Sequence, residues 1–215
     1  PVAEFLATVR PSQVVLAAAR VGGILANATY PVEFLSDNLQ VQLNVLNGAV
    51  ANGVEKVLFL GSSCIYPKFA PQPIAESSLL TGPLEPTNDA YAIAKIAGVL
   101  HVQAIRRQHG LPYISAMPTN LYGPGDNFDL ESSHVLPAMI RKMHDAKALG
   151  LQQVTLWGTG RVRREFLHVD DAAEACWYLL EHYDAPEPIN VGTGEDLMIV
   201  ELAELVKEIV GYDGG

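Results

Sequence analysis

Short apolar runs alternate with longer amphipathic stretches along most of the chain. We predict buried strands at residues 13–19, 55–61, 111–120, 154–157, 165–169 and 189–191. Helices are predicted at residues 2–9, 31–52, 89–108, 134–148, 170–182 and 200–210. Strands that are apolar on both faces and alternate with helices are typical of a doubly wound parallel sheet. The expected fold class is therefore α/β.

Small or polar residues lie at the carboxyl ends of three of the predicted strands. These segments are the small residues after Leu16, which lead to Gly22-Gly23, then Gly61-Ser62-Ser63-Cys64 and Pro118-Thr119-Asn120. Ligands of open parallel sheets bind at the carboxyl ends of the strands, and glycine lets a backbone approach a ligand closely. The three segments therefore predict a ligand site at one edge of the sheet.

Tyr91 and Lys95 lie four residues apart in the predicted helix 89–108, so their side chains share one face of it. A phenol ordinarily titrates at about pH 10. A neighbouring ammonium favours the phenolate, so we expect Lys95 to lower the pKa of Tyr91 and to make the phenol a proton donor and acceptor near neutral pH. Taken alone, the pair also fits an ordinary helix with one tyrosine and one lysine.

Composition restricts the partners of the chain. It has 215 residues, of which 49% are hydrophobic and 18% charged, so a sizeable core is expected. The net charge of −10 argues against nonspecific binding of nucleic acid or acidic membranes. No apolar run reaches membrane-spanning length, and the first residues lack a signal-peptide pattern. We therefore expect neither a nucleic-acid nor a membrane partner.

The two cysteines, Cys64 and Cys176, form no disulfide framework and have no metal-ligand spacing. A low cysteine count of this kind fits a reducing, cytoplasmic setting. No metal is expected.

Five strings carry a resemblance to a known family: GSSCIYP at 61–67, LEPTN at 84–88, YAIAK at 91–95, MPTNLYGP at 117–124 and REFLHVDD at 164–171. With Ser62 at a strand end and Tyr91 four residues before Lys95, the chain resembles the extended class of the short-chain dehydrogenase/reductases. Within that class the strings are most similar to the epimerase/reductases of a GDP-bound 4-keto-6-deoxy sugar. The resemblance covers almost the whole chain. It implies a Rossmann-like sheet, an NADP cofactor and a GDP-sugar substrate.

The family opens with a glycine-rich turn that binds the NADPH pyrophosphate at a helix N-terminus. No such glycine pattern precedes Val14, and the family continues beyond Gly215. We therefore expect an internal fragment that lacks the first βαβ unit of the sheet and part of a smaller substrate domain. Residues 1–123 and 165–183 are expected in the dinucleotide-binding domain, and residues 124–164 and 184–215 in the substrate domain.

The resemblance implies that the substrate is first epimerised at C3 and C5, beside its C4 ketone. Inversion needs one group that removes a proton and another that returns one on the opposite face. The family assigns these roles to the positions of Cys64, as the base, and His134, as the acid. A thiol and an imidazole ordinarily titrate at about 8.5 and about 6.5. A free cysteine is more commonly a small buried hydrophobe, and His134 alone fits a helix N-terminus.

Reduction of the C4 ketone by NADPH is the second implied step. Tyr91 would protonate the oxygen, Ser62 would hydrogen-bond to it, and Lys95 would hold the nicotinamide ribose. Asn44 corresponds either to an asparagine that supports this lysine through water in relatives or to a solvated helix residue. The residues expected to bind the cofactor are Leu60, Gly61, Ser62, Ser63, Tyr91, Lys95, Pro118, Thr119, Asn120, Leu121 and His134.

A basic cluster stands out against the negative net charge. Its members are Arg141, Lys142, Arg161, Arg163 and Arg164. Such a cluster suits a diphosphate, and the indole of Trp157 suits stacking on guanine. By similarity, the expected substrate contacts are Lys142, Trp157 and Arg164. Arg161 and Arg163, which precede Arg164 in the chain, also fit a solvated loop.

Two other functions fit the same residues. A UDP-hexose 4-epimerase uses the same serine, tyrosine and lysine without a thiol–imidazole pair, and such relatives usually carry threonine at the position of Cys64. A non-catalytic fragment would keep only the nucleotide-sugar patch. Many relatives form a dimer through the helices that correspond to residues 31–52 and 89–108, so the resemblance also implies a homodimer.

Overall fold

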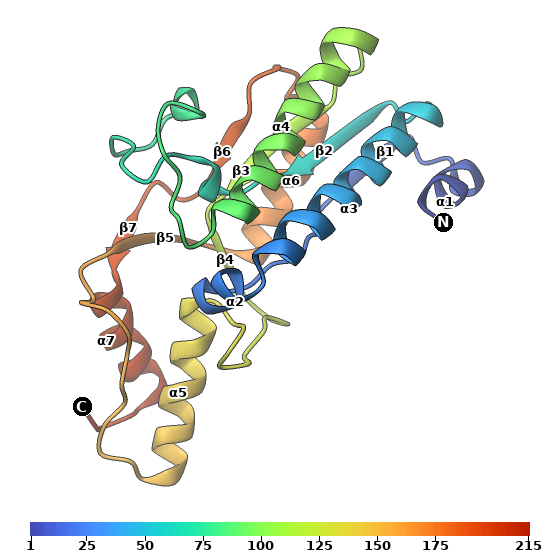
Figure 1. The fold of residues 1–215 in the computed structure, drawn as a ribbon. Helices are drawn as coiled ribbons and strands as arrows, with labels where there is room; N and C mark the ends of the chain where they lie inside the picture. Colours follow the sequence, from blue (N-terminus) through green and yellow to red (C-terminus); the bar gives the residue numbers. More distant parts are fainter.

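The computed structural model describes residues 1–215, and its main sheet has four parallel strands (Figure 1). They are β1 (Gln13–Leu16), β2 (Lys56–Leu60), β3 (Ile114–Pro118) and β6 (Ile189–Val191), in the order β1-β2-β3-β6. Leu58 in the middle of β2 lies opposite Val15 on one side and Ile114 on the other. The predicted α/β fold with a parallel sheet is confirmed.

Helices cover both faces of this sheet. Helices α3 (Pro31–Ala51) and α4 (Asp89–His109) lie side by side on one face, and α6 (Val169–His182) lies on the other (Figure 1). Successive side chains of a strand point to opposite faces. Accordingly Val57 and Phe59 pack in the core cluster with α3 and α4, whereas Leu58 packs with Leu179 of α6.

A second, smaller sheet contains β4 (Asn120–Tyr122), β5 (Arg163–His168) and β7 (Asp196–Met198). Strands β4 and β5 are parallel, whereas β5 and β7 are antiparallel. Helices α5 (Val135–Leu149) and α7 (Ile199–Val210) pack against each other beside it, in the lower part of Figure 1. Their contact is a separate core cluster formed by Leu136, Met139, Met143, Ala146, Leu202, Ala203, Val206 and Tyr212.

The remaining elements are α1 (Val2–Val9), α2 (Ile24–Thr29) and the short 3-10 helices η1 (Ser63–Ile65) and η2 (Glu76–Ser78). The sequence pattern missed α2, β4 and β7, which are three to six residues long. None of the helices combines the length and the apolar character needed to cross a membrane.

The strand predicted at residues 154–157 is wrong. Val154 and Leu156 alternate because they pack against the core between α5 and α7, and no neighbouring strand pairs with them. The backbone N–H of Val154 donates instead to the carbonyl of Gly215 at 2.7 Å. The alternating apolar pattern at residues 154–157 therefore comes from a segment without regular secondary structure, in which Val154 and Leu156 are partly buried.

Candidate active site

The carboxyl end of β2 leads directly into η1, and this turn carries two of the candidate residues. Gly61 lies close against β3, because a Cβ there would lie 2.3 Å from the sulfur of Met117 and would displace that side chain. Its N–H donates to the carbonyl of Ala116 at 2.8 Å, which keeps the turn against β3. The Ser62 hydroxyl then accepts a hydrogen bond from the N–H of Cys64 at 3.3 Å, as the N-cap of η1. Ser62 and Cys64 are thus held at the strand end that the sequence predicted.

Helix α4 brings Tyr91 and Lys95 to the same strand end. The close approach depends on Gly98, where a Cβ would lie 2.3 Å from Cζ of Phe59. Lys95 is only 4% exposed, and its ammonium donates to the carbonyl of Leu60 at 2.8 Å. The side chain of Lys95 therefore bridges α4 and the end of β2.

The electrostatics of this pair differ from the expectation. Burial raises the pKa of Tyr91, the nearby Cys64 raises it further, and the Ser62 hydroxyl lowers it in part. The expected lowering by Lys95 is wrong for this structure, because the ammonium is turned to the Leu60 carbonyl. Burial also lowers the pKa of Lys95 itself from 10.5 to about 8.

Cys64 lies in η1, which packs against α4, and a charged sulfur there contributes to the raised pKa of Tyr91. The sulfur is partly exposed, and it accepts a hydrogen bond from Nδ2 of Asn88 at 3.3 Å. The alternative in which Cys64 is only a buried hydrophobe therefore does not describe this side chain. The structure brings Ser62, Cys64, Tyr91 and Lys95 together.

His134 is the exposed N-cap residue of α5, on a different element from the other four candidates. The N–H of Gly23 donates to the carbonyl of Ser132 at 3.0 Å, and a Cβ at Gly23 would lie 2.5 Å from the carbonyl oxygen of Ser133. The Gly22-Gly23 segment after β1 thus packs against the residues before His134. No side-chain hydrogen bond joins the imidazole to the other four candidates.

Phe34 connects this glycine segment to the phenol. A Cβ at Gly22 would lie 3.1 Å from Cζ of Phe34, and the Phe34 ring meets the Tyr91 ring edge-on at 6.3 Å between centroids. The segment that the sequence suggested for a ligand is therefore occupied by protein contacts that link α3, α4 and the start of α5.

Two of the residues expected to line the cofactor hold the strands together instead. The Thr119 hydroxyl and Nδ2 of Asn120 both donate to the carbonyl of Glu165, at 2.8 and 2.9 Å. The carboxylate of Glu165 accepts the N–H of Gly194 at 2.7 Å. Sequence analysis missed Glu165, which ties β4, β5 and the turn after β6 into one unit. Its place between Arg164 and an apolar strand gave no signal of this role.

Asn44 lies on the exposed side of α3. The buried amides of this helix belong to Asn38 and Gln42. Gln42 donates to the carbonyl of Ala94 at 2.8 Å, directly before Lys95. Gln42, rather than Asn44, is therefore the α3 side chain that braces the lysine segment.

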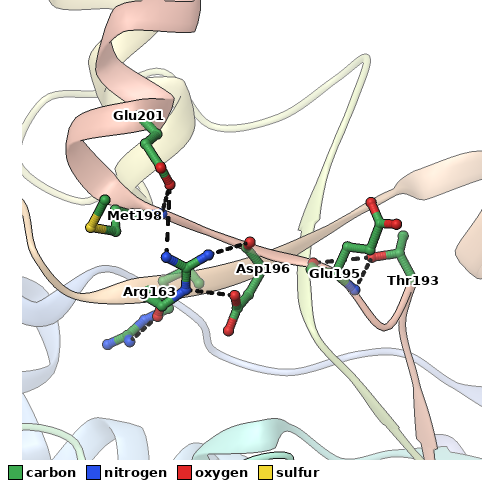
Figure 2. Close-up of polar contacts among 7 residues, drawn as sticks. Arg163, Thr193, Glu195, Asp196, Met198 and Glu201 are labelled. Atoms are coloured by element: carbon green, nitrogen blue, oxygen red, sulfur yellow. Dashed lines mark hydrogen bonds and ion pairs between the residues drawn. The ribbon is translucent and has the colours of Figure 1, made fainter.

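Arg163 is engaged within the protein, as Figure 2 shows. Its guanidinium donates to Oδ1 of Asp196 at 2.7 Å and to the carbonyl of Asp196 at 2.9 Å, and it lies 3.9 Å from Glu201. Asp196 also raises the pKa of Arg163. These contacts join β5 to β7 and to the first turn of α7, so Arg163 is not part of a free basic cluster.

Arg141 is likewise paired, with Asp145 one helical turn away. In contrast, Lys142 lies over the Trp157 ring at 5.2 Å and donates to the carbonyl of Thr155 at 3.3 Å. Arg161 and Arg164 have no acidic partner within 4.0 Å, and Trp157 is 72% exposed. The structure thus brings two of the three expected substrate residues into contact and leaves the third accessible.

Known proteins are similar to this chain in sequence and in fold. The sequence profile of the NAD dependent epimerase/dehydratase family matches residues 1–192. GDP-L-fucose synthase 1 of Arabidopsis thaliana is 61% identical over 213 residues, which are 99% of this chain and 66% of that protein. GDP-L-fucose synthase of Sinorhizobium fredii is 56% identical over 99% of this chain and 68% of that protein. A solved GDP-D-glycero-L-gluco-heptose synthase from Campylobacter jejuni, in the presence of NADPH, has a TM-score of 0.91 at 34% identity and covers 100% of this chain and 74% of its own.

The chain therefore belongs to the NAD dependent epimerase/dehydratase family. Within that family its sequence is similar to GDP-L-fucose synthases, which confirms the resemblance to extended short-chain dehydrogenase/reductases. The chain spans 65% to 66% of the length of three curated plant relatives that it matches.

Proposed function

We propose that this chain carries the catalytic residues of a GDP-L-fucose synthase. This enzyme epimerises GDP-4-keto-6-deoxy-D-mannose at C3 and C5 and reduces the C4 ketone with NADPH. The observation that carries the proposal is that a thiol, Cys64, lies with Ser62 at the end of β2, where α4 also brings Tyr91 and Lys95. A thiol at this place supplies a base for carbon acids that a simple reductase does not need.

Epimerisation uses Cys64 and His134. The Cys64 thiolate takes the proton from the carbon beside the ketone, and the C–H electron pair forms an enolate whose oxygen carries the charge. Ser62 and Tyr91 stabilise that oxygen by donating hydrogen bonds. His134 then gives a proton to the opposite face of the carbon. The exposed position of His134 at the start of α5 supports this role, because its imidazole is open to a ligand.

The residues present fit a nicotinamide cofactor. The Lys95 ammonium uses one hydrogen bond on Leu60 and has donors left for ribose hydroxyls. The backbone of residues 60–63 and 118–121 would flank the ring, while Thr119 and Asn120 keep their side chains on Glu165. When bound, NADPH would supply the hydride for the C4 carbon. Tyr91 gives its proton to the C4 oxygen, and its raised pKa keeps the phenol protonated until the charge develops.

The GDP part of the substrate would bind beside α5. Lys142 and Arg164 would pair with the diphosphate, and Trp157 would stack on guanine. The contact of Lys142 with the Trp157 ring supports a common site for phosphate and base.

The alternative of a UDP-hexose 4-epimerase leaves the thiol without a role. Such an enzyme oxidises and re-reduces C4 and needs no proton transfer at C3 and C5. The place of Cys64 in the turn after β2, where Asn88 contacts its sulfur, therefore favours the epimerase/reductase. A purely binding protein would likewise need no lysine buried beneath the phenol.

The test is solvent deuterium exchange into the sugar at C3 and C5. We expect Cys64→Ala and His134→Ala to slow this exchange by about 10²–10⁴-fold, as for lost acid–base groups. Cys176→Ala, which removes the other thiol, should leave the rate unchanged. Exchange at the parent rate in Cys64→Ala and His134→Ala would rule out the proposed epimerisation. A lack of thermal stabilisation by saturating NADPH would instead support a binding fragment.

A homodimer through α3 and α4 forms part of the proposal. The outer face of this helix pair exposes Leu43, Ile93 and Leu100, which are 45%, 47% and 41% accessible. Sedimentation velocity should show a dimer that Leu100→Glu dissociates, because a charge would be buried without a partner. A monomeric parent protein would contradict this part.

The domain division also stays a proposal. Residues 165–183 are assigned to the dinucleotide-binding domain because Leu179 and Leu180 of α6 pack on the main sheet. The separate core between α5 and α7 supports a substrate domain from residues 124–164 and 184–215. A cytoplasmic location fits the two free cysteines.

A further inference from the structure

Asn88 occupies the N-cap position of α4 without capping the helix through its side chain. An asparagine at this position ordinarily accepts a hydrogen bond from the N–H two or three residues later. Here only the backbone carbonyl of Asn88 serves the helix, by accepting the N–H of Ala92 at 3.0 Å. The amide side chain is therefore available for another partner.

That partner is the candidate base. Nδ2 of Asn88 donates to Sγ of Cys64 at 3.3 Å, while Oδ1 of the same amide is buried and has no hydrogen-bond partner. A buried unpaired acceptor costs stability, so its presence calls for an explanation. The Asn88 side chain therefore does not cap the helix, and its carbonyl oxygen makes no hydrogen bond, while its Nδ2 donates to the Cys64 sulfur.

We propose that Asn88 is a positioning residue for Cys64, which orients the sulfur toward the sugar and stabilises its thiolate. An N–H donor favours the charged form of its acceptor. This inference deepens the proposed function and rests on Cys64 as the base. When the thiolate takes the carbon-bound proton, the new S–H bond replaces the negative charge, and the amide remains a weaker donor to the neutral sulfur.

The chemical reactivity of Cys64 tests the contact without any substrate. Iodoacetamide alkylation is followed across pH by peptide mass spectrometry, which reports Cys64 and Cys176 separately. We expect Asn88→Ala to slow alkylation of Cys64 at pH 7 about tenfold and to move its pH profile upward, because a donor to a charged acceptor is lost. Asn88→Asp should slow it further through like-charge repulsion, while Cys176 is unaffected in both.

Two further variants separate this effect from damage to the loop. Asn88→Ser keeps a good helix N-cap but is too short to reach the sulfur, so it should also slow alkylation if Asn88→Ala fails to fold. Thr87→Ala changes the neighbouring exposed residue and should leave alkylation at the parent rate. An unchanged pH profile in Asn88→Ala or Asn88→Ser, or an equal change in Thr87→Ala, would overturn the proposal.

Deuterium exchange into the sugar distinguishes this proposal from the function on which it rests. Slower alkylation together with slower exchange at C3 and C5 supports both. Slower alkylation with exchange at the parent rate would support the contact between Asn88 and Cys64 but would overturn Cys64 as the base. Alkylation at the parent rate overturns the role of Asn88 whatever the exchange rate.

Discussion

Lys95 and Trp157 are both proposed to bind ligands, yet Lys95 is 4% exposed and Trp157 is 72% exposed. The contrast extends to their surroundings. The first region, Ser62 to Lys95, lies at the end of a buried parallel sheet, and its side chains have protein partners. The second region, Lys142 to Arg164, lies beside α5, where Lys142 and Trp157 contact each other at the surface.

This difference in burial predicts which substitutions should alter the chemical step and which should alter ligand binding. In the buried region the protein has already fixed the groups, so changes there should alter the chemical step or the stability of the fold. In the exposed region the side chains become ordered only when the ligand binds. Substitutions there should therefore alter KM more than kcat. The predictions below test this division in order of decreasing expected effect.

The largest effect is expected for Tyr91→Phe. Loss of the phenolic proton should lower the rate of NADPH oxidation by about 10²–10⁴-fold, because the phenol is the proposed proton donor to the ketone oxygen. The phenyl ring keeps its edge-on contact with Phe34, so the melting temperature should change little. Deuterium exchange at C3 and C5 should continue, which separates the two steps. Tyr122→Phe on β4 is the control and should behave as the parent; parent-like NADPH oxidation in Tyr91→Phe would refute the assignment.

Lys95→Met should change how stability depends on pH. The folded pKa of about 8 lies below the ordinary 10.5, so between these values the unfolded chain binds more protons than the folded one. Stability should therefore rise with pH in this window, by about 2 kcal/mol from pH 8 to 9.5. Below pH 8 the buried ammonium keeps its full cost. Urea unfolding at several pH values should show a flatter curve in Lys95→Met; two parallel curves would contradict the burial argument.

Gly98→Ala should lower stability by about 1–3 kcal/mol, because the new Cβ meets the Phe59 ring in a packed core. Gly48→Ala on α3 is the matched control, since both changes improve helix propensity. At Gly48 the Cβ would lie 3.0 Å from Cδ1 of Leu6, the flexible end of a side chain. Urea unfolding should thus give a loss for Gly98→Ala and little change or a gain for Gly48→Ala. Equal effects would show that the approach of α4 to β2 does not depend on Gly98.

The same division explains what could be predicted from the sequence. The parallel sheet follows from the apolar runs, and the nearness of Cys64 to Ser62 follows from their spacing on one turn. The convergence of Ser62 with Tyr91 was implied by the family resemblance. Arg163 pairs with Asp196, and Asn120 donates to the carbonyl of Glu165. Neither contact could be predicted from the sequence, because the two partners of each pair lie on strands that are distant in sequence. The raised pKa of Tyr91 could not be predicted either, since the burial of the phenol and the direction of the Lys95 ammonium depend on the tertiary structure.

Trp157→Ala addresses the exposed region and should have the smallest effect. Loss of the indole removes both the proposed stacking on guanine and the contact with Lys142, so KM for the GDP-sugar should rise about tenfold. The melting temperature and kcat should stay near the parent values, because an exposed side chain contributes little to the core. Trp177→Ala on α6 is the matched control, since that indole is also exposed, at 61%. A fall in kcat with KM unchanged would mean that Trp157 acts on the chemical step, and the two regions would not divide binding from chemistry.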